Sequence, residues 1–104
     1  MSRRAEAIRV RGQVQGVGFR PFVYRLATRS ELAGFVRNDT TGVVIEAEGV
    51  DVDPFVAALS AEAPPVAEVR SVQVEEATHH AFPLSHFLVY GIGKPLLERG
   101  LLPQ

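Results

Sequence analysis

The stretch Gln13-Val14-Gln15-Gly16-Val17-Gly18-Phe19-Arg20-Pro21 joins a strand-like segment to a helix-like one. Gly16 and Gly18 stand one residue apart, and glycine adopts backbone dihedrals that are closed to other residues. Successive N–H groups can then turn inward and form a concave nest for a phosphate-sized anion. Arg20 would close this nest, because its guanidinium offers a planar fork of donors to two phosphate oxygens and stays charged near pH 7.

The beginning of the helix also favours an anion. Pro21 is expected at the first helical position, where its missing N–H costs no hydrogen bond. No Ser, Thr, Asp or Asn precedes it to cap the free amides, and residues 21–25 hold no acid to offset the positive end of the helix dipole. The alternative is an ordinary glycine-containing turn with a surface arginine, and glycine spacing alone leaves that alternative open.

Two common phosphate motifs do not match this stretch. The dinucleotide fingerprint needs a third glycine where Pro21 stands, and no Gly-Lys-Ser/Thr follows as a P-loop requires. The charge pattern supports an anion site, since residues 7–30 hold five arginines and no acid. Residues 1–38 hold eight arginines and two acids, whereas residues 39–104 hold three basic and ten acidic residues. This asymmetry favours one local anion site over a nucleic-acid surface, which needs a broad basic face.

Length and composition limit the other possibilities. A chain of 104 residues with net charge −1 fits one domain with its own core. It has no cysteine, which excludes disulfides and thiolate metal sites, and no apolar run approaches the roughly 20 residues that span a bilayer. His79, His80 and His86 do not suggest a metal site, because adjacent histidines on an extended segment point to opposite faces. We expect a cytoplasmic protein without a membrane partner.

Hydrophobic periodicity predicts a single layered domain. The predicted order is strand, helix, strand, strand, helix, strand, strand, over residues 6–14, 21–29, 35–38, 43–49, 54–63, 66–76 and 87–90. This order is typical of an α+β, ferredoxin-like (βαββαβ) sandwich, with an antiparallel sheet of four to five strands and two helices on one face. Residues 1–90 would form the domain, and residues 91–104, which show no clear period, a tail of uncertain structure.

Three details of this prediction can be checked directly. The apolar stripe of the first helix consists of Phe22, Val23, Leu26 and Ala27. Asp53 is expected to cap the second helix, with Pro54 at its first position. The valines of residues 66–76 fall out of phase, which indicates either a bulge near Arg70-Ser71 or a later start of the strand.

Two segments resemble a known family. Val14 to Arg20, followed by Gly34-Phe35-Val36-Arg37-Asn38, resembles the two-part signature of the acylphosphatases. The run from Gly16 to Ala27, with its Pro-Phe-Val segment, is similar to the N-terminal acylphosphatase-like domain of the hydrogenase-maturation carbamoyltransferases called HypF. The resemblance covers roughly residues 6–90 and is weak beyond Val66. It implies the same ferredoxin-like fold.

The resemblance also implies roles for particular residues. Phosphate binding falls to Arg20 and to the backbone amides of Gln15, Gly16, Val17, Gly18 and Phe19. Arg20 and Asn38 would be catalytic, with Asn38 orienting the attacking water. Read without the family, Asn38 is an ordinary turn-forming asparagine. The implied activity is hydrolysis of acyl phosphates, with carbamoyl phosphate as one candidate, and with no metal or cofactor. Acyl phosphate and inorganic phosphate are the expected small-molecule ligands.

Two further hypotheses come from other classes of protein. The chain could be a binding module that presents carbamoyl phosphate within a larger carbamoyltransferase, with slow or incidental hydrolysis. It would then be covalently part of that enzyme rather than a free monomer. Single-stranded RNA binding is the third hypothesis, but nothing in the sequence resembles the paired aromatic residues that stack RNA bases on such sheets. We therefore expect no nucleic-acid partner.

Overall fold

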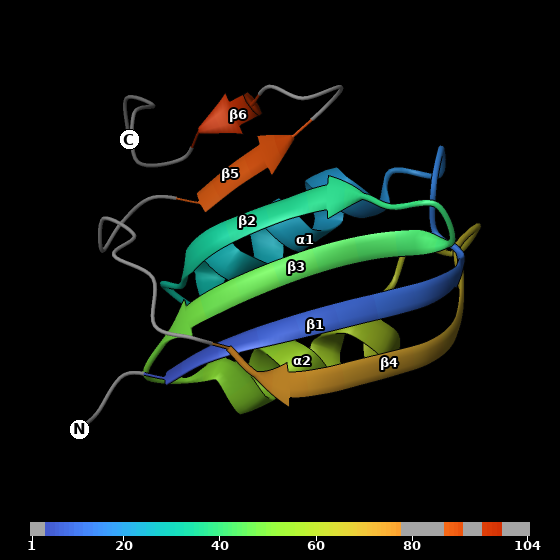
Figure 1. Cartoon of the computed structure of the whole chain (residues 1–104). Coiled ribbons are helices and arrows are strands. Elements are labelled where there is room, and N and C mark those ends of the chain that lie inside the picture. Colours follow the sequence, from blue (N-terminus) through green and yellow to red (C-terminus); the bar gives the residue numbers. More distant parts are fainter. Residues whose placement is uncertain (1–3, 78–86, 91–94, 99–104) are drawn as a thin grey trace.

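The computed structural model describes residues 4–77, 87–90 and 95–98. Within these residues, six strands and two helices follow one another, and Figure 1 shows both helices on one face of the sheet. They are β1 (Arg4–Gln13), α1 (Phe19–Arg29), β2 (Ala33–Asn38), β3 (Gly42–Gly49), α2 (Val52–Ala61), β4 (Glu68–Glu76), β5 (Phe87–Tyr90) and β6 (Pro95–Glu98). The predicted ferredoxin-like α+β fold is confirmed.

The sheet differs from the prediction in two respects. It has six strands in the order β4-β1-β3-β2-β5-β6 rather than four or five, and β5 runs parallel to β2. The parallel pairing has a packing reason, because it places Phe87 and Val89, which are 0% and 3% exposed, in the hydrophobic core. Residues 91–104 were predicted only as a tail of uncertain structure, and within them residues 95–98 form β6, which pairs with β5. His79, His80 and His86 lie outside the described residues.

The core lies between the sheet and the two helices. The predicted stripe of α1 is confirmed, since Phe22, Val23, Leu26 and Ala27 are all buried. Ile8, Val10, Val36, Val43 and Ile45 meet them from the sheet. Neither helix in the described part of the chain is long and apolar enough to cross a membrane.

The predicted bulge in the last long strand is also confirmed. Arg11 pairs with Ser71 and Gly12 pairs with Val69, so Arg70 is the extra residue on β4. An extra residue on one strand increases the local twist of the pair. The bulge lies near the end of β1, just before the chain enters the loop that leads to α1.

The start of α2 was predicted wrongly by two residues. The helix begins at Val52, with Asp51 rather than Asp53 in the N-cap position, and Pro54 is its third residue. Val52 is fully buried. Burial of this side chain adds a favourable hydrophobic contribution to the first turn that a capping rule does not include.

This packing gives a prediction about stability. Val52→Ala should lower the free energy of unfolding by roughly 1.5–3 kcal/mol, because it removes buried methyl groups and leaves a cavity. Val50→Ala is the matched control, since Val50 is 40% exposed and its loss should cost less than about 0.5 kcal/mol. Urea unfolding of both variants measures the difference. Equal effects would show that Val52 does not anchor the helix.

Candidate active site

The loop between β1 and α1 is held at both ends by buried side chains. Val14 and Phe19 are each 1% exposed and belong to the core. Phe19 also packs on Phe22, with 5.3 Å between ring centroids, and Val17 is partly buried against the same core. The backbone of residues 15–18 is therefore anchored at both ends, by the buried side chains of Val14 and Phe19.

The two glycines of this loop adopt the dihedrals that the nest requires. Gly16 has φ 75° and Gly18 has φ 79°, both in the left-handed region. A Cβ built on either one would meet no atom within 4 Å, so both glycines border open space rather than packed protein. The amides of residues 16–19 donate no backbone hydrogen bond to any residue that the structure describes. This combination of free N–H groups and left-handed glycines is what an anion nest needs.

The helix begins two residues earlier than predicted. Gly18 is its N-cap and Phe19 its first residue, so Pro21 occupies the third position rather than the first. The first intrahelical bond runs from the amide of Phe22 to the carbonyl of Gly18, at 3.2 Å. Pro21 still costs no hydrogen bond, because the first four helical amides have no intrahelical acceptor. The earlier start could not be predicted from the sequence, because the left-handed conformation of Gly18 at the N-cap depends on the folded structure around it.

The electrostatics of this helix end favour an anion. The first turn holds no acid and no side chain caps it. Arg20 is the second residue of α1 and is partly buried. A permanent cation is thus placed in the same turn as free N–H groups at the positive end of the helix dipole.

Asn38 lies at the carboxyl end of β2, opposite Val43 on β3. Strand alternation puts its side chain on the same side of β2 as the buried Val36, which is the side covered by the helices. Its Oδ1 is enclosed and accepts no hydrogen bond from the described residues. Figure 1 shows the end of β2 and the start of α1 at the same end of the sheet. An amide oxygen accepts hydrogen bonds, so Asn38 contributes one acceptor at this end of the sheet.

The side chain of Gln15 connects the loop to the turn between β2 and β3. Its Nε2 donates to the carbonyl of Asp39 and to the carbonyl of Gly42, the latter at 2.8 Å. The sequence assigned only the backbone amide of Gln15 to the site. The bond to Asp39 joins residues that are 24 positions apart in the sequence, so no local pattern could have predicted it.

Asp39 is held from several sides. Its Oδ1 accepts a hydrogen bond from the amide of Thr40 at 2.7 Å, and its Oδ2 accepts one from the guanidinium of Arg9. The pKa of Asp39 is lowered from its ordinary 3.8, chiefly by the Thr40 amide, with further contributions from Arg9 and Arg37. The carboxylate therefore stays ionised near neutral pH and keeps its bond to Arg9.

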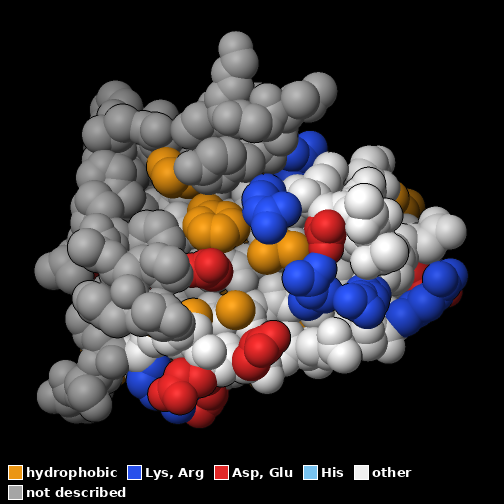
Figure 2. All heavy atoms as spheres, viewed as in Figure 1, with side chains coloured by type: hydrophobic (Ala, Val, Ile, Leu, Met, Phe, Trp, Pro, Cys, Tyr) orange, Lys and Arg blue, Asp and Glu red, His pale blue; other side chains and the backbone are white. Residues whose placement is uncertain are grey.

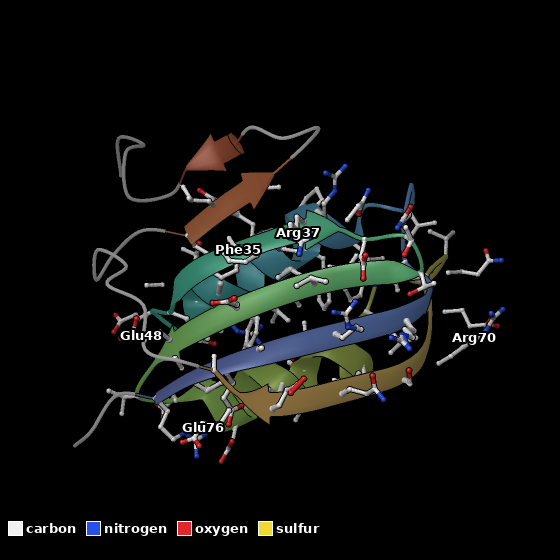
Figure 3. All side chains as sticks on the ribbon, in the orientation of Figure 1. Phe35, Arg37, Glu48, Arg70 and Glu76 are labelled. Atoms are coloured by element: carbon white, nitrogen blue, oxygen red, sulfur yellow. The ribbon has the colours of Figure 1, made fainter. Side chains whose placement is uncertain are left out.

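The cations around Asp39 lie on the sheet face that the helices leave uncovered. Figure 2 shows arginine side chains gathered on this face around an acidic one. Arg9 on β1, Val44 on β3 and Arg37 on β2 face one another across the strands. Figure 3 places Arg37 beside Phe35 on β2. Some of the arginines that the sequence concentrates in the first third of the chain therefore lie beside the turn that follows Asn38.

Comparison with known proteins identifies the family of this chain. A sequence model of the family Acylphosphatase matches residues 6–87. The acylphosphatase of Oceanobacillus iheyensis is 43% identical over 72 residues, which cover 66% of this chain and 79% of that protein.

Other relatives are much longer proteins. The carbamoyltransferase HypF of Rhizobium leguminosarum bv. viciae is 56% identical over 69 residues, or 66% of this chain, and the match spans only 9% of that relative. A crystal structure of full-length HypF in the phosphate- and nucleotide-bound form superposes with a TM-score of 0.81 at 33% identity, over 86% of this chain and 12% of that one. The chain belongs to the acylphosphatase family, which is a family of acyl phosphate hydrolases.

Proposed function

We propose that this chain hydrolyses acyl phosphates to a carboxylate and inorganic phosphate without a metal ion. The observation that carries the proposal is the loop of free amides at residues 16–19, with two open left-handed glycines and Arg20 in the adjoining helical turn. These groups can hold three phosphate oxygens and spread their charge. Phosphoryl transfer from a good leaving group needs mainly positioning and charge stabilisation, and this donor set supplies both.

In the proposed mechanism the phosphoryl group sits on the amides of Gln15, Gly16, Val17, Gly18 and Phe19 and on the guanidinium of Arg20. Oδ1 of Asn38 accepts a hydrogen bond from a water and directs it toward phosphorus. The bond from phosphorus to the bridging oxygen breaks as the water attacks, and the carboxylate leaves with that bond's electron pair. A carboxylate is a good leaving group, so no general acid is required.

A second candidate function is supported by the relatives. In this alternative the chain is a carbamoyl-phosphate-binding N-terminal domain of a HypF-type carbamoyltransferase, and hydrolysis is weak or absent. The identity is 56% with a HypF carbamoyltransferase and 43% with an acylphosphatase. The phosphate loop would serve both functions, because carbamoyl phosphate is itself an acyl phosphate.

Hydrolysis of benzoyl phosphate, a generic acyl phosphate, tests the first proposal. We expect turnover that is unchanged by EDTA, because Arg20 and the loop amides supply the positive charge that a metal ion provides in other phosphoryl-transfer sites. Millimolar inorganic phosphate should inhibit competitively. Loss of activity in EDTA with recovery on adding Mg²⁺ would contradict the mechanism. Phosphate binding without turnover on benzoyl or carbamoyl phosphate would favour the binding domain.

Replacement of Arg20 and replacement of Asn38 should have different effects on phosphate inhibition and on turnover. Arg20→Ala should weaken phosphate inhibition and abolish turnover, because Arg20 touches the phosphoryl group in ground and transition states. Asn38→Ala should lower kcat by about 10²- to 10³-fold and leave the phosphate inhibition constant nearly unchanged, since Asn38 touches only the water. Arg25→Ala, on the exposed side of α1, is the matched control for the lost arginine. Full kcat in a folded Asn38→Ala variant would remove Asn38 from the mechanism.

The glycine dihedrals give a further prediction. Gly18→Ala should weaken phosphate inhibition and lower kcat by more than its loss of stability explains, because alanine at φ 79° is strained by roughly 1–2 kcal/mol and the loop would relax away from the nest. Thermal unfolding measures the first effect and the phosphate inhibition constant the second. Unaltered phosphate inhibition in this variant would mean that the loop amides do not bind the anion.

A further inference from the structure

Oδ1 of Asn38 accepts no hydrogen bond, from the residues that the structure describes, that would fix its direction. This oxygen is enclosed by the protein. The oxygen must nevertheless point in one direction if it is to orient a water. Its orientation is therefore set by the packing that encloses it and by how firmly the backbone of residues 38 and 39 is held.

Asp39, the next residue, is held through its backbone and its side chain. Its amide donates to the carbonyl of Gly42 at 2.8 Å, and its carbonyl accepts a hydrogen bond from Nε2 of Gln15. Its carboxylate binds the amide of Thr40 at 2.7 Å and the guanidinium of Arg9. These bonds fix Asp39 to its own turn, to β1 and to the phosphate loop.

The bond from Gln15 gives this arrangement a link to the phosphate loop. Gln15 directly precedes Gly16, the first glycine of the loop, and uses both N–H groups of its amide on the turn, at Asp39 and Gly42. The Asp39–Gly42 hydrogen bond already closes the turn. The Gln15 bonds are therefore not needed to form the turn, but they fix its position relative to the loop that would hold the phosphate.

We propose that Gln15, Asp39 and Arg9 form a latch that positions Asn38 against the phosphate loop. None of the three side chains touches substrate in this inference, so they are positioning residues. The inference rests on the proposed hydrolysis, in which Asn38 directs the water. Arg9 reaches the latch from the uncovered face of the sheet, whereas Gln15 reaches it from the loop. The latch residues would thus affect the distance between water and phosphorus through Asn38, although they contact neither the water nor the phosphoryl group.

A double-mutant cycle with Asn38 tests the latch. Gln15→Met keeps the length of the side chain but removes its donors, and Asp39→Asn removes the charge that binds Arg9. Each should lower kcat for benzoyl phosphate by about 10- to 100-fold, the range expected for a small misplacement of a reacting group, while the phosphate inhibition constant changes less than about threefold. In an Asn38→Ala background the same replacements should have no further effect on kcat.

The control variant changes another residue of the same turn. Thr41→Ala changes an exposed residue of the same turn that makes none of the latch bonds, and it should leave kcat unchanged. An equal loss of kcat in the wild-type and Asn38→Ala backgrounds would overturn the latch, because it would show that the replacements act on the fold or the phosphate loop instead. Arg9→Gln provides an independent disruption if Asp39→Asn fails to fold.

A measurement without substrate separates failure of the latch from failure of the proposed function. In the free protein, ¹⁵N relaxation of the Asn38 side-chain amide should report a more mobile group in Gln15→Met and Asp39→Asn than in wild type or Thr41→Ala. Unchanged mobility in both variants would overturn the latch even if wild type hydrolyses acyl phosphates. Increased mobility in these variants, together with a wild type that shows no turnover, would support the latch and reject hydrolysis.

Discussion

The short span between Val14 and Phe19 is the constraint on which the site depends. Both side chains are buried in the core, one at the end of the sheet layer and one at the start of the helix layer. The backbone between them has to reverse into α1, and it does so through two left-handed glycines. The same dihedrals leave the amides of residues 16–19 without backbone partners among the described residues. The requirement for core packing and the requirement for an anion nest are met by one conformation.

This arrangement explains why the positive charge of the chain is local. In the proposed anion site, the neutral amides of the loop are complemented by a permanent cation, Arg20, which lies in the first turn of α1. Arg9 of β1 and Arg37 of β2 serve a different purpose, because they lie on the face of the sheet that the helices leave uncovered, where Arg9 binds Asp39 and both lower its pKa. Other arginines of the basic N-terminal third form ion pairs elsewhere, Arg4 with Asp53 and Arg29 with Glu62.

The sequence was sufficient for features that depend on local pattern. The stripe of α1 and the bulge at Arg70 each follow from periodicity within a few residues. The features it missed depend on distant contacts. Val52 extends α2 because it is buried, and β5 joins β2 in parallel because its alternate side chains enter the core. The bonds of Gln15 to the turn belong to this second class, so the site's positioning groups could not be read from the chain.

Hydrolysis and carbamoyl-phosphate binding make different demands on Asn38. Both need the phosphate loop, so the open glycines and Arg20 do not distinguish them. The proposed hydrolysis gives a role to the amide oxygen of Asn38, which is enclosed at the end of β2 and accepts no hydrogen bond from the described protein, whereas presentation of a ligand does not require one. Enclosing a polar atom without a protein partner costs free energy, on the order of 1–3 kcal/mol, unless a water satisfies it. Such a water would lie beside the end of β2, where the proposed hydrolysis places the nucleophile, so the role of Asn38 is the point on which the two proposed functions differ.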